Sequence, residues 1–159
     1  MLPKPTTTVI RRLSPEELTA ANQLLDVFDA AFAPWDRPEK RTYDMTKLLA
    51  NPAFIAFVVE VEGKVVAGLT AYELIVLSNG DREVLIYDFA THPEHQRSGI
   101  GVQLMKAFQI HCRENGITYA FLNAHSDNKG ALEFYRSLDM DEVKVVFFGF
   151  ETETKNSNQ

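Results

Sequence analysis

A glycine-containing turn is the part of this sequence with the clearest chemical potential. The turn Gln96-Arg97-Ser98-Gly99-Ile100-Gly101 follows a β-type run and precedes an amphipathic stretch with helical spacing. The first N–H groups of a helix lack partners and the helix dipole is positive there, so a pyrophosphate can bind along Arg97 to Val102. Glycines at 99 and 101 let phosphates approach without a Cβ clash, and Arg97 adds a cationic contact. The alternative is a tight turn that binds nothing.

An aspartate inside an otherwise apolar run is the second chemical signal. Asp88 lies within Val84 to Thr91, although aspartate is depleted in strands and costly to bury without a partner. An amine ligand is largely an ammonium ion at neutral pH, with a lysine-like reference pKa of about 10.4, and is a nucleophile only as the free base. A carboxylate at this position can hold the cation and accept its proton. The alternative is an aspartate that bonds backbone amides at a strand bulge.

The composition indicates one folded domain over residues 1–150, followed by a polar tail over 151–159. The chain has 159 residues, of which 45% are hydrophobic and 11% aromatic, enough for one core. No apolar run approaches the roughly 20 residues that span a bilayer, and the N-terminus lacks a signal-peptide pattern. We therefore expect a cytoplasmic protein without membrane association. The formal charge of −6 favours a cationic ligand over nucleic acid.

The first half of the chain predicts helices followed by a β-meander. We expect a strand over Val9–Arg12, a helix capped by Ser14 that runs to Pro34, and a shorter helix over about Pro38–Ala50. Three antiparallel strands joined by two hairpin turns then follow, over Phe54–Val61, Lys64–Leu77 and Glu83–Thr91.

The second half predicts alternating helices and strands. The expected order is a helix over Gly99–Asn115, a strand over Ile117–Ala124, a helix over Asp127–Leu138 and a strand over Val143–Phe150. The strands on either side of the Gly99–Asn115 helix should be parallel, because a crossover helix joins them. The fold class is therefore α/β, with a mixed, mostly antiparallel sheet of about six strands and about four helices.

Two motifs in this order resemble the GCN5-related N-acetyltransferase (GNAT) superfamily. The turn matches the family's Gln/Arg-x-x-Gly-x-Gly/Ala signature, and Asn128-x-x-Ala131-x-x-Phe134-Tyr135-x-x-Leu138 matches its second motif downstream. The resemblance implies the GNAT fold, acetyl-CoA as cofactor, and a single acetyltransferase domain. One departure is Asp139, in Leu138-Asp139-Met140, where the family usually has Leu-Gly-Phe.

The resemblance also assigns the residues that bind the cofactor. The fourth strand should separate from the fifth at a bulge, where the pantetheine arm bonds the backbone over Phe89-Ala90-Thr91. The pyrophosphate should take amides from Arg97 to Val102, and Asn128 and Ala131 of the second motif should also contact the cofactor. The hydroxyl of Tyr135 should lie near the thioester sulfur and act as the general acid. The alternative for Tyr135 is an ordinary packing residue beside Phe134.

A closer resemblance, over about Leu24 to Phe150, is to the aminoglycoside 3-N-acetyltransferases of the gentamicin-resistance type. Ile86-Tyr87-Asp88-Phe89-Ala90 carries it best, since those enzymes have an aspartate near the acetyl end of the cofactor that Asp88 matches. Acceptor contacts then fall to Asp88 and, more weakly, to Trp35, Asp36, Tyr43 and His125. Packing is the alternative for Trp35, Asp36 and Tyr43.

These features predict an aminoglycoside N-acetyltransferase that works by direct attack of the amine on bound acetyl-CoA. Two alternatives stay open: a GNAT enzyme for a polyamine, amino acid or peptide amine, and a non-enzymatic acyl-CoA-binding module. We expect no metal, because His92-x-x-His95 has no neighbouring cysteine and a structural zinc site normally has four ligands. A homodimer is compatible with the sequence.

Overall fold

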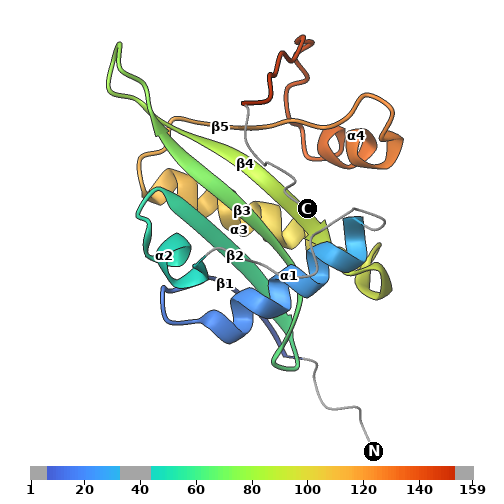
Figure 1. Cartoon of the computed structure of the whole chain (residues 1–159). Coiled ribbons are helices and arrows are strands. Elements are labelled where there is room, and N and C mark those ends of the chain that lie inside the picture. The colour runs from blue at the N-terminus through green and yellow to red at the C-terminus, as the bar shows by residue number, and fades with distance from the viewer. Residues whose placement is uncertain (1–6, 33–43, 153–159) are drawn as a thin grey trace, which may run out of the picture. The chain divides into compact units, whose positions relative to one another are not determined.

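The computed structural model describes residues 7–32 and 44–152, and the chain forms two compact units, Met1–Asn123 and Ala124–Gln159. The first unit contains a five-stranded sheet and three α-helices (Figure 1). Its elements are β1 (Thr8–Arg12), α1 (Leu18–Phe32), α2 (Met45–Ala50), β2 (Phe54–Val61), β3 (Lys64–Ile75), β4 (Arg82–Thr91), a 3₁₀ turn η1 (Pro93–His95), α3 (Ile100–Glu114) and β5 (Tyr119–Leu122).

The sheet is mixed and mostly antiparallel, as the sequence predicts. Its strands lie in chain order, with antiparallel pairs from β1 to β4 and a parallel β4–β5 pair. Helix α3 joins the two parallel strands, as a parallel connection requires. The fold is therefore the expected α/β GNAT fold, with five strands where about six were predicted.

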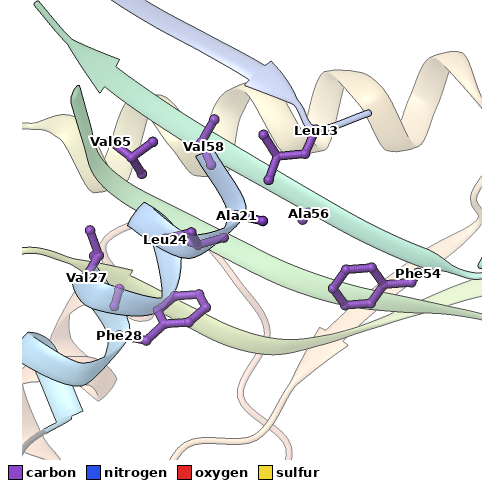
Figure 2. Packing of buried hydrophobic residues seen from close by; sticks show 10 residues of the cluster. Leu13, Ala21, Leu24, Val27, Phe28, Phe54, Ala56, Val58 and Val65 are labelled. Carbon is purple, nitrogen blue, oxygen red and sulfur yellow. The ribbon is translucent and has the colours of Figure 1, made fainter. Parts of the chain in front are cut away.

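Alternation along β2 builds a core on each face of the sheet. Phe54, Ala56 and Val58 belong to the cluster that packs against α1, as Figure 2 shows. Phe57 points to the opposite face, where its ring makes an edge-to-face contact with Phe108 of α3 at 5.6 Å. Because strand side chains alternate between faces, the buried strand β2 contributes side chains to the core on the α1 side and to the core on the α3 side. Figure 1 shows α1 and α3 on opposite sides of the sheet.

The predicted hairpin turn at Glu62-Gly63 is confirmed. Both residues have positive φ, 52° for Glu62 and 77° for Gly63, which is the geometry of a two-residue turn that matches strand twist. Gly116, with φ of 68°, ends the α3 region as the predicted glycine after a helix.

Helix α1 begins later than predicted. Helical bonding starts with Ala21 N–H donating to the Glu17 carbonyl at 3.0 Å, so Ser14 to Glu17 form a turn. The Glu17 carboxylate accepts the Ser14 N–H at 2.7 Å and also pairs with Arg11. These side-chain bonds hold the segment as a separate turn before the helix. Helix α2 starts at Met45 with Asp44 as its cap, and the rest of the predicted helix, 38–43, lies outside the described residues.

The second unit contains α4 (Lys129–Arg136), which confirms the predicted helix with shorter ends. The predicted strand over Val143–Phe150 is wrong: these residues form no regular secondary structure, and their apolar side chains are exposed. Alternation and β-branched residues favour a strand, but only a hydrogen-bonded neighbour makes one, and the sheet ends at β5. Of the predicted polar tail, 153–159 lie outside the described residues. No helix in the described ranges is long and apolar enough to cross a membrane.

Gly68 of β3 lies where α1 packs closely on the sheet and leaves no space for a side chain. A Cβ at this position would lie 2.5 Å from the Phe57 carbonyl oxygen and would also collide with a Leu24 methyl group. We expect Gly68→Ala to lower the free energy of unfolding by about 1–3 kcal/mol, because the backbone carbonyl cannot rotate away as a side chain can. The urea midpoint should fall at constant m-value.

Gly130→Ala is the matched control, because its Cβ would meet nothing nearer than the Asn128 Oδ1 at 3.9 Å. This variant should be as stable as the wild type or slightly more so. Equal stability of Gly68→Ala and wild type would contradict the close packing of α1 on β3.

Candidate active site

A β-bulge in β4 sets the direction of Asp88. Thr70 of β3 is paired with Asp88 and the next residue, Ala71, is paired with Ile86, so Tyr87 is an extra residue in β4. Residues opposite each other in a pair share one face of the sheet, which places Asp88 on the face of Thr70 and Tyr72. Without the extra residue, Asp88 would share the face of Ile86. The bulge thus turns the carboxylate toward the α1 side.

The Asp88 carboxylate is held by a side chain of the neighbouring strand. Thr70 Oγ1 donates a hydrogen bond to Asp88 Oδ2 at 2.7 Å, and Thr70 is only 9% exposed. The sequence left open that the Asp88 side chain bonds backbone amides. Among the described residues, the hydrogen bond to this carboxylate comes instead from the Thr70 hydroxyl. Sequence reasoning missed Thr70, since the contact depends on the register of β3 and β4.

Asp88 lines a cavity of about 220 Å³ between the sheet and the helices α1 and α2. Apolar side chains of α1, α2 and β2 make most of its wall, including Phe28, Leu48 and Phe54. Thr70, Tyr72 and Asp88 bring the polar atoms. A carboxylate in such a place attracts a cationic group, because the apolar wall strengthens its field. Trp35, Asp36 and Tyr43, the weaker acceptor candidates, lie outside the described residues.

Beyond the bulge, β4 is paired on one side only with the strands of the described residues. The pairing of β5 with β4 runs from Glu83 to Ile86, whereas β4 continues to Thr91 and stays paired with β3 over that length. This is the separation of the fourth and fifth strands that the family resemblance implies. Phe89, Ala90 and Thr91 form this end of β4, and the Thr91 carbonyl accepts a bond from Gln96 Nε2 at 3.2 Å.

The turn that follows β4 is tightly organised before α3 begins. His92 N–H donates to the Val66 carbonyl at 2.8 Å, which extends the β3–β4 pairing into the turn. Ser98 Oγ donates to the carbonyl of His95, the last residue of η1, at 2.5 Å. Arg97 and Gly99 both have left-handed backbone, with φ of 58° and 81°. Left-handed residues in such a turn make successive N–H groups converge into an anion-binding nest.

The N-terminus of α3 fits a phosphate group. Its cap residue is Gly99, and no side chain caps the first turn, so the helix leaves the N–H groups of Ile100, Gly101 and Val102 without a side-chain partner. A Cβ at Gly99 would meet nothing within 4 Å, so the space above the turn is open. Together with the positive end of the dipole, these donors match the pyrophosphate of acetyl-CoA.

The residues of the second motif occupy α4 and its cap. Asn128 caps α4, with its Oδ1 accepting the Ala131 N–H at 3.1 Å, which leaves the amide nitrogen as a donor for a ligand. The Tyr135 ring contacts that of Phe134 at 5.2 Å, and burial raises the pKa of Tyr135 to about 12. Tyr135 is therefore a protonated phenol at neutral pH, as a general acid must be. His125 is exposed, and its carbonyl accepts the Asn128 N–H at 3.0 Å.

Two other reactive side chains of α3, Cys112 and His111, are packed against neighbouring residues. Burial raises the pKa of the Cys112 thiol to about 11, which makes it a poor nucleophile at neutral pH. The His111 ring lies against Phe57 and Phe108, with centroids 5.2 and 6.1 Å away. Within 7–32 and 44–152, no three His, Cys, Asp or Glu side chains form a group that could hold a metal.

Asp139 resolves the departure in the second motif. Its φ is 55°, so the residue that stands where the family usually has glycine has a left-handed backbone. Aspartate adopts this conformation more readily than most residues other than glycine. Asp139 can therefore hold a left-handed backbone at the position where the family usually has glycine.

Known proteins share this fold over nearly the whole chain. The Acetyltransferase (GNAT) family matches residues 21–140. The aminoglycoside acetyltransferase meta-AAC0020, from an uncultured soil metagenomic sample and solved with trehalose, is 33% identical, with a TM-score of 0.86 over 92% of this chain and 97% of that chain. Its structure with sisomicin gives 32% identity and a TM-score of 0.87 over the same shares.

A curated relative points to the same class of protein. An uncharacterized N-acetyltransferase of Methanocaldococcus jannaschii is 36% identical over 92 residues, which are 57% of this chain and 40% of that protein. The match thus spans about two fifths of the relative's length. These matches agree with the mixed sheet, with the extension of β4 beyond β5 and with the glycine turn. The chain belongs to the Acetyltransferase (GNAT) family.

Proposed function

We propose that this chain transfers the acetyl group of acetyl-CoA to the 3-amino group of an aminoglycoside by direct attack of the amine. The observation that carries the proposal is the Asp88 carboxylate, turned by a bulge into a cavity and held by Thr70. Similarity to two aminoglycoside acetyltransferases from soil metagenomic samples, meta-AAC0020 and HMB0005, at 33% and 28% identity over 92% of this chain, supports this acceptor class.

The chain's own residues divide the work of binding acetyl-CoA. The N–H groups at the start of α3 would hold the pyrophosphate, and the end of β4 at Phe89 to Thr91 would hold the pantetheine arm through backbone bonds. Asn128 would donate its amide to the same arm. When bound, acetyl-CoA supplies an activated thioester.

Two side chains would then move the protons. Asp88 holds the acceptor ammonium and accepts its proton, directly or through water, which frees the nitrogen lone pair. The nitrogen would form a bond to the acetyl carbon as the carbon–sulfur bond breaks, and would release its second proton to solvent as the amide forms. Tyr135 gives its phenolic proton to the departing sulfur, and solvent replaces that proton later. No covalent enzyme intermediate is required, in keeping with the buried Cys112 thiol.

Release of free thiol from acetyl-CoA tests the acceptor class. The purified protein is assayed with gentamicin and sisomicin, with spermidine, and with free amino acids. We expect turnover with the aminoglycosides, and NMR of the product should place the acetyl group on the 3-amino group. If only spermidine or the amino acids give turnover, the acceptor is that class of amine and not an aminoglycoside. Binding of acetyl-CoA without turnover would favour a regulatory module.

Gly99 tests the pyrophosphate site. Asparagine tolerates the left-handed backbone of this position better than other side chains, so Gly99→Asn adds bulk above the turn with little strain. We expect its affinity for acetyl-CoA, measured by calorimetry, to fall at least about tenfold, or about 1.4 kcal/mol.

Gly80→Asn is the matched control, because Gly80 has φ of 74° and an equally open Cβ position in the β3–β4 hairpin. This variant should bind acetyl-CoA as the wild type does. Unchanged affinity in a folded Gly99→Asn protein would move the pyrophosphate away from this turn.

A further inference from the structure

Thr70 is the one polar residue that is buried in the part of the chain that the structure describes. Its neighbours in β3, Leu69 and Ala71, are fully buried and apolar. A valine has the same shape and would suit this place, whereas a hydroxyl is costly to bury unless it is hydrogen-bonded. The hydroxyl of Thr70 meets this need by donating to Asp88.

We propose that Thr70 is a positioning residue for the acetyl transfer, a role that rests on the function proposed for Asp88. The Thr70 hydroxyl fixes Asp88 Oδ2 at 2.7 Å, so the carboxylate cannot rotate freely about its last bond. Oδ1 has no side-chain donor among the described residues and is the oxygen presented to the amine. The acceptor ammonium donates to Oδ1, and its proton passes there before the nitrogen attacks.

A hydrogen bond to a charged group is among the stronger ones in proteins, so its loss should be measurable. Thr70→Val removes the hydroxyl and keeps the shape. We expect kcat/KM for gentamicin to fall about 10–100-fold, with the KM for acetyl-CoA unchanged. Thr70→Ser keeps the hydroxyl and should restore kcat/KM to within about threefold of wild type.

A double-mutant cycle distinguishes positioning from packing. If Thr70 acts through Asp88, adding Thr70→Val to Asp88→Asn should cause little further loss, because the carboxylate is already gone. A packing role predicts that the two losses multiply. If Thr70→Val proves too unstable to assay, Thr70→Ala removes the same hydroxyl, and Thr70→Ser again serves as the rescue.

Crystal structures add a readout that does not depend on turnover. The Asp88 carboxylate should keep one orientation in wild type and in Thr70→Ser, and should rotate or take several orientations in Thr70→Val. An unchanged carboxylate in Thr70→Val would overturn the inference. Wild-type kcat/KM in Thr70→Val beside an impaired Asp88→Asn would overturn it as well, while leaving the proposed function intact. Full activity of Asp88→Asn on gentamicin would overturn the inference and the role proposed for Asp88, and would leave the acetylation of an aminoglycoside standing.

Discussion

Asp88→Asn should abolish most acetylation of the acceptor while acetyl-CoA still binds with wild-type affinity. Asparagine keeps the shape and can still accept the Thr70 hydrogen bond, but it has no charge and is no base near neutral pH. A general base typically contributes about 10²–10⁴-fold, which sets the expected loss of kcat. Steady-state kinetics with gentamicin, together with calorimetry for acetyl-CoA, measure the two effects separately.

The kinetic pattern tells which role Asp88 has. If it only anchors the amine, KM for the acceptor should rise with little change in kcat; if it is the base, kcat should fall and recover partly at higher pH, where more free amine exists. Raising the salt concentration should weaken gentamicin binding to wild type more than to Asp88→Asn.

Glu83→Gln is the matched control for Asp88→Asn, since it removes one negative charge from the same strand, outside the cavity wall. It should leave kcat and both KM values within about threefold of wild type. Unimpaired acetylation by Asp88→Asn would remove this residue from the chemistry.

Tyr135→Phe should lower kcat by about 10²–10⁴-fold, because it removes the group that we propose as proton donor to the sulfur. Affinity for acetyl-CoA and thermal stability should change little. Burial raises the pKa of Tyr135 to about 12, so the wild-type phenol stays protonated across the usual assay range. The ratio of wild-type to Tyr135→Phe activity should therefore be constant from about pH 6 to pH 9.

Tyr119→Phe provides the matched control, because it removes the same hydroxyl from an exposed position on β5. Its kinetics should match those of wild type. A Tyr135→Phe enzyme within threefold of wild type at every pH would leave Tyr135 a packing residue beside Phe134.

Local signals predicted most of the fold. Strand β2 has the predicted bounds, and Glu62-Gly63 is the predicted turn, because alternation and turn chemistry act over a few residues. The prediction of a strand over Val143–Phe150 is wrong because a strand needs a hydrogen-bonded partner, and local sequence does not specify that partner.

The candidate site was predictable in its residues and not in its geometry. The glycine turn and Asp88 stand out by type and spacing, and the motif resemblance adds Asn128 and Tyr135. The contact of Thr70 with Asp88 is different, because it depends on which residue of β4 is extra. The residue types around Tyr87 do not indicate that Tyr87 is the extra residue, because a bulge depends on how two strands pair.

That extra residue divides β4 into two parts with different freedom to change. Before Tyr87, the strand has a neighbour on each side and buries Val84 and Ile86 completely or nearly so. After Tyr87, the strands of the described residues pair with β4 through β3 alone. Mutations of Val84 and Ile86 should therefore act through folding, and mutation of Asp88 through activity. One extra residue thus gives a single strand both a packing role, at Val84 and Ile86, and a side chain that reaches the cavity, at Asp88.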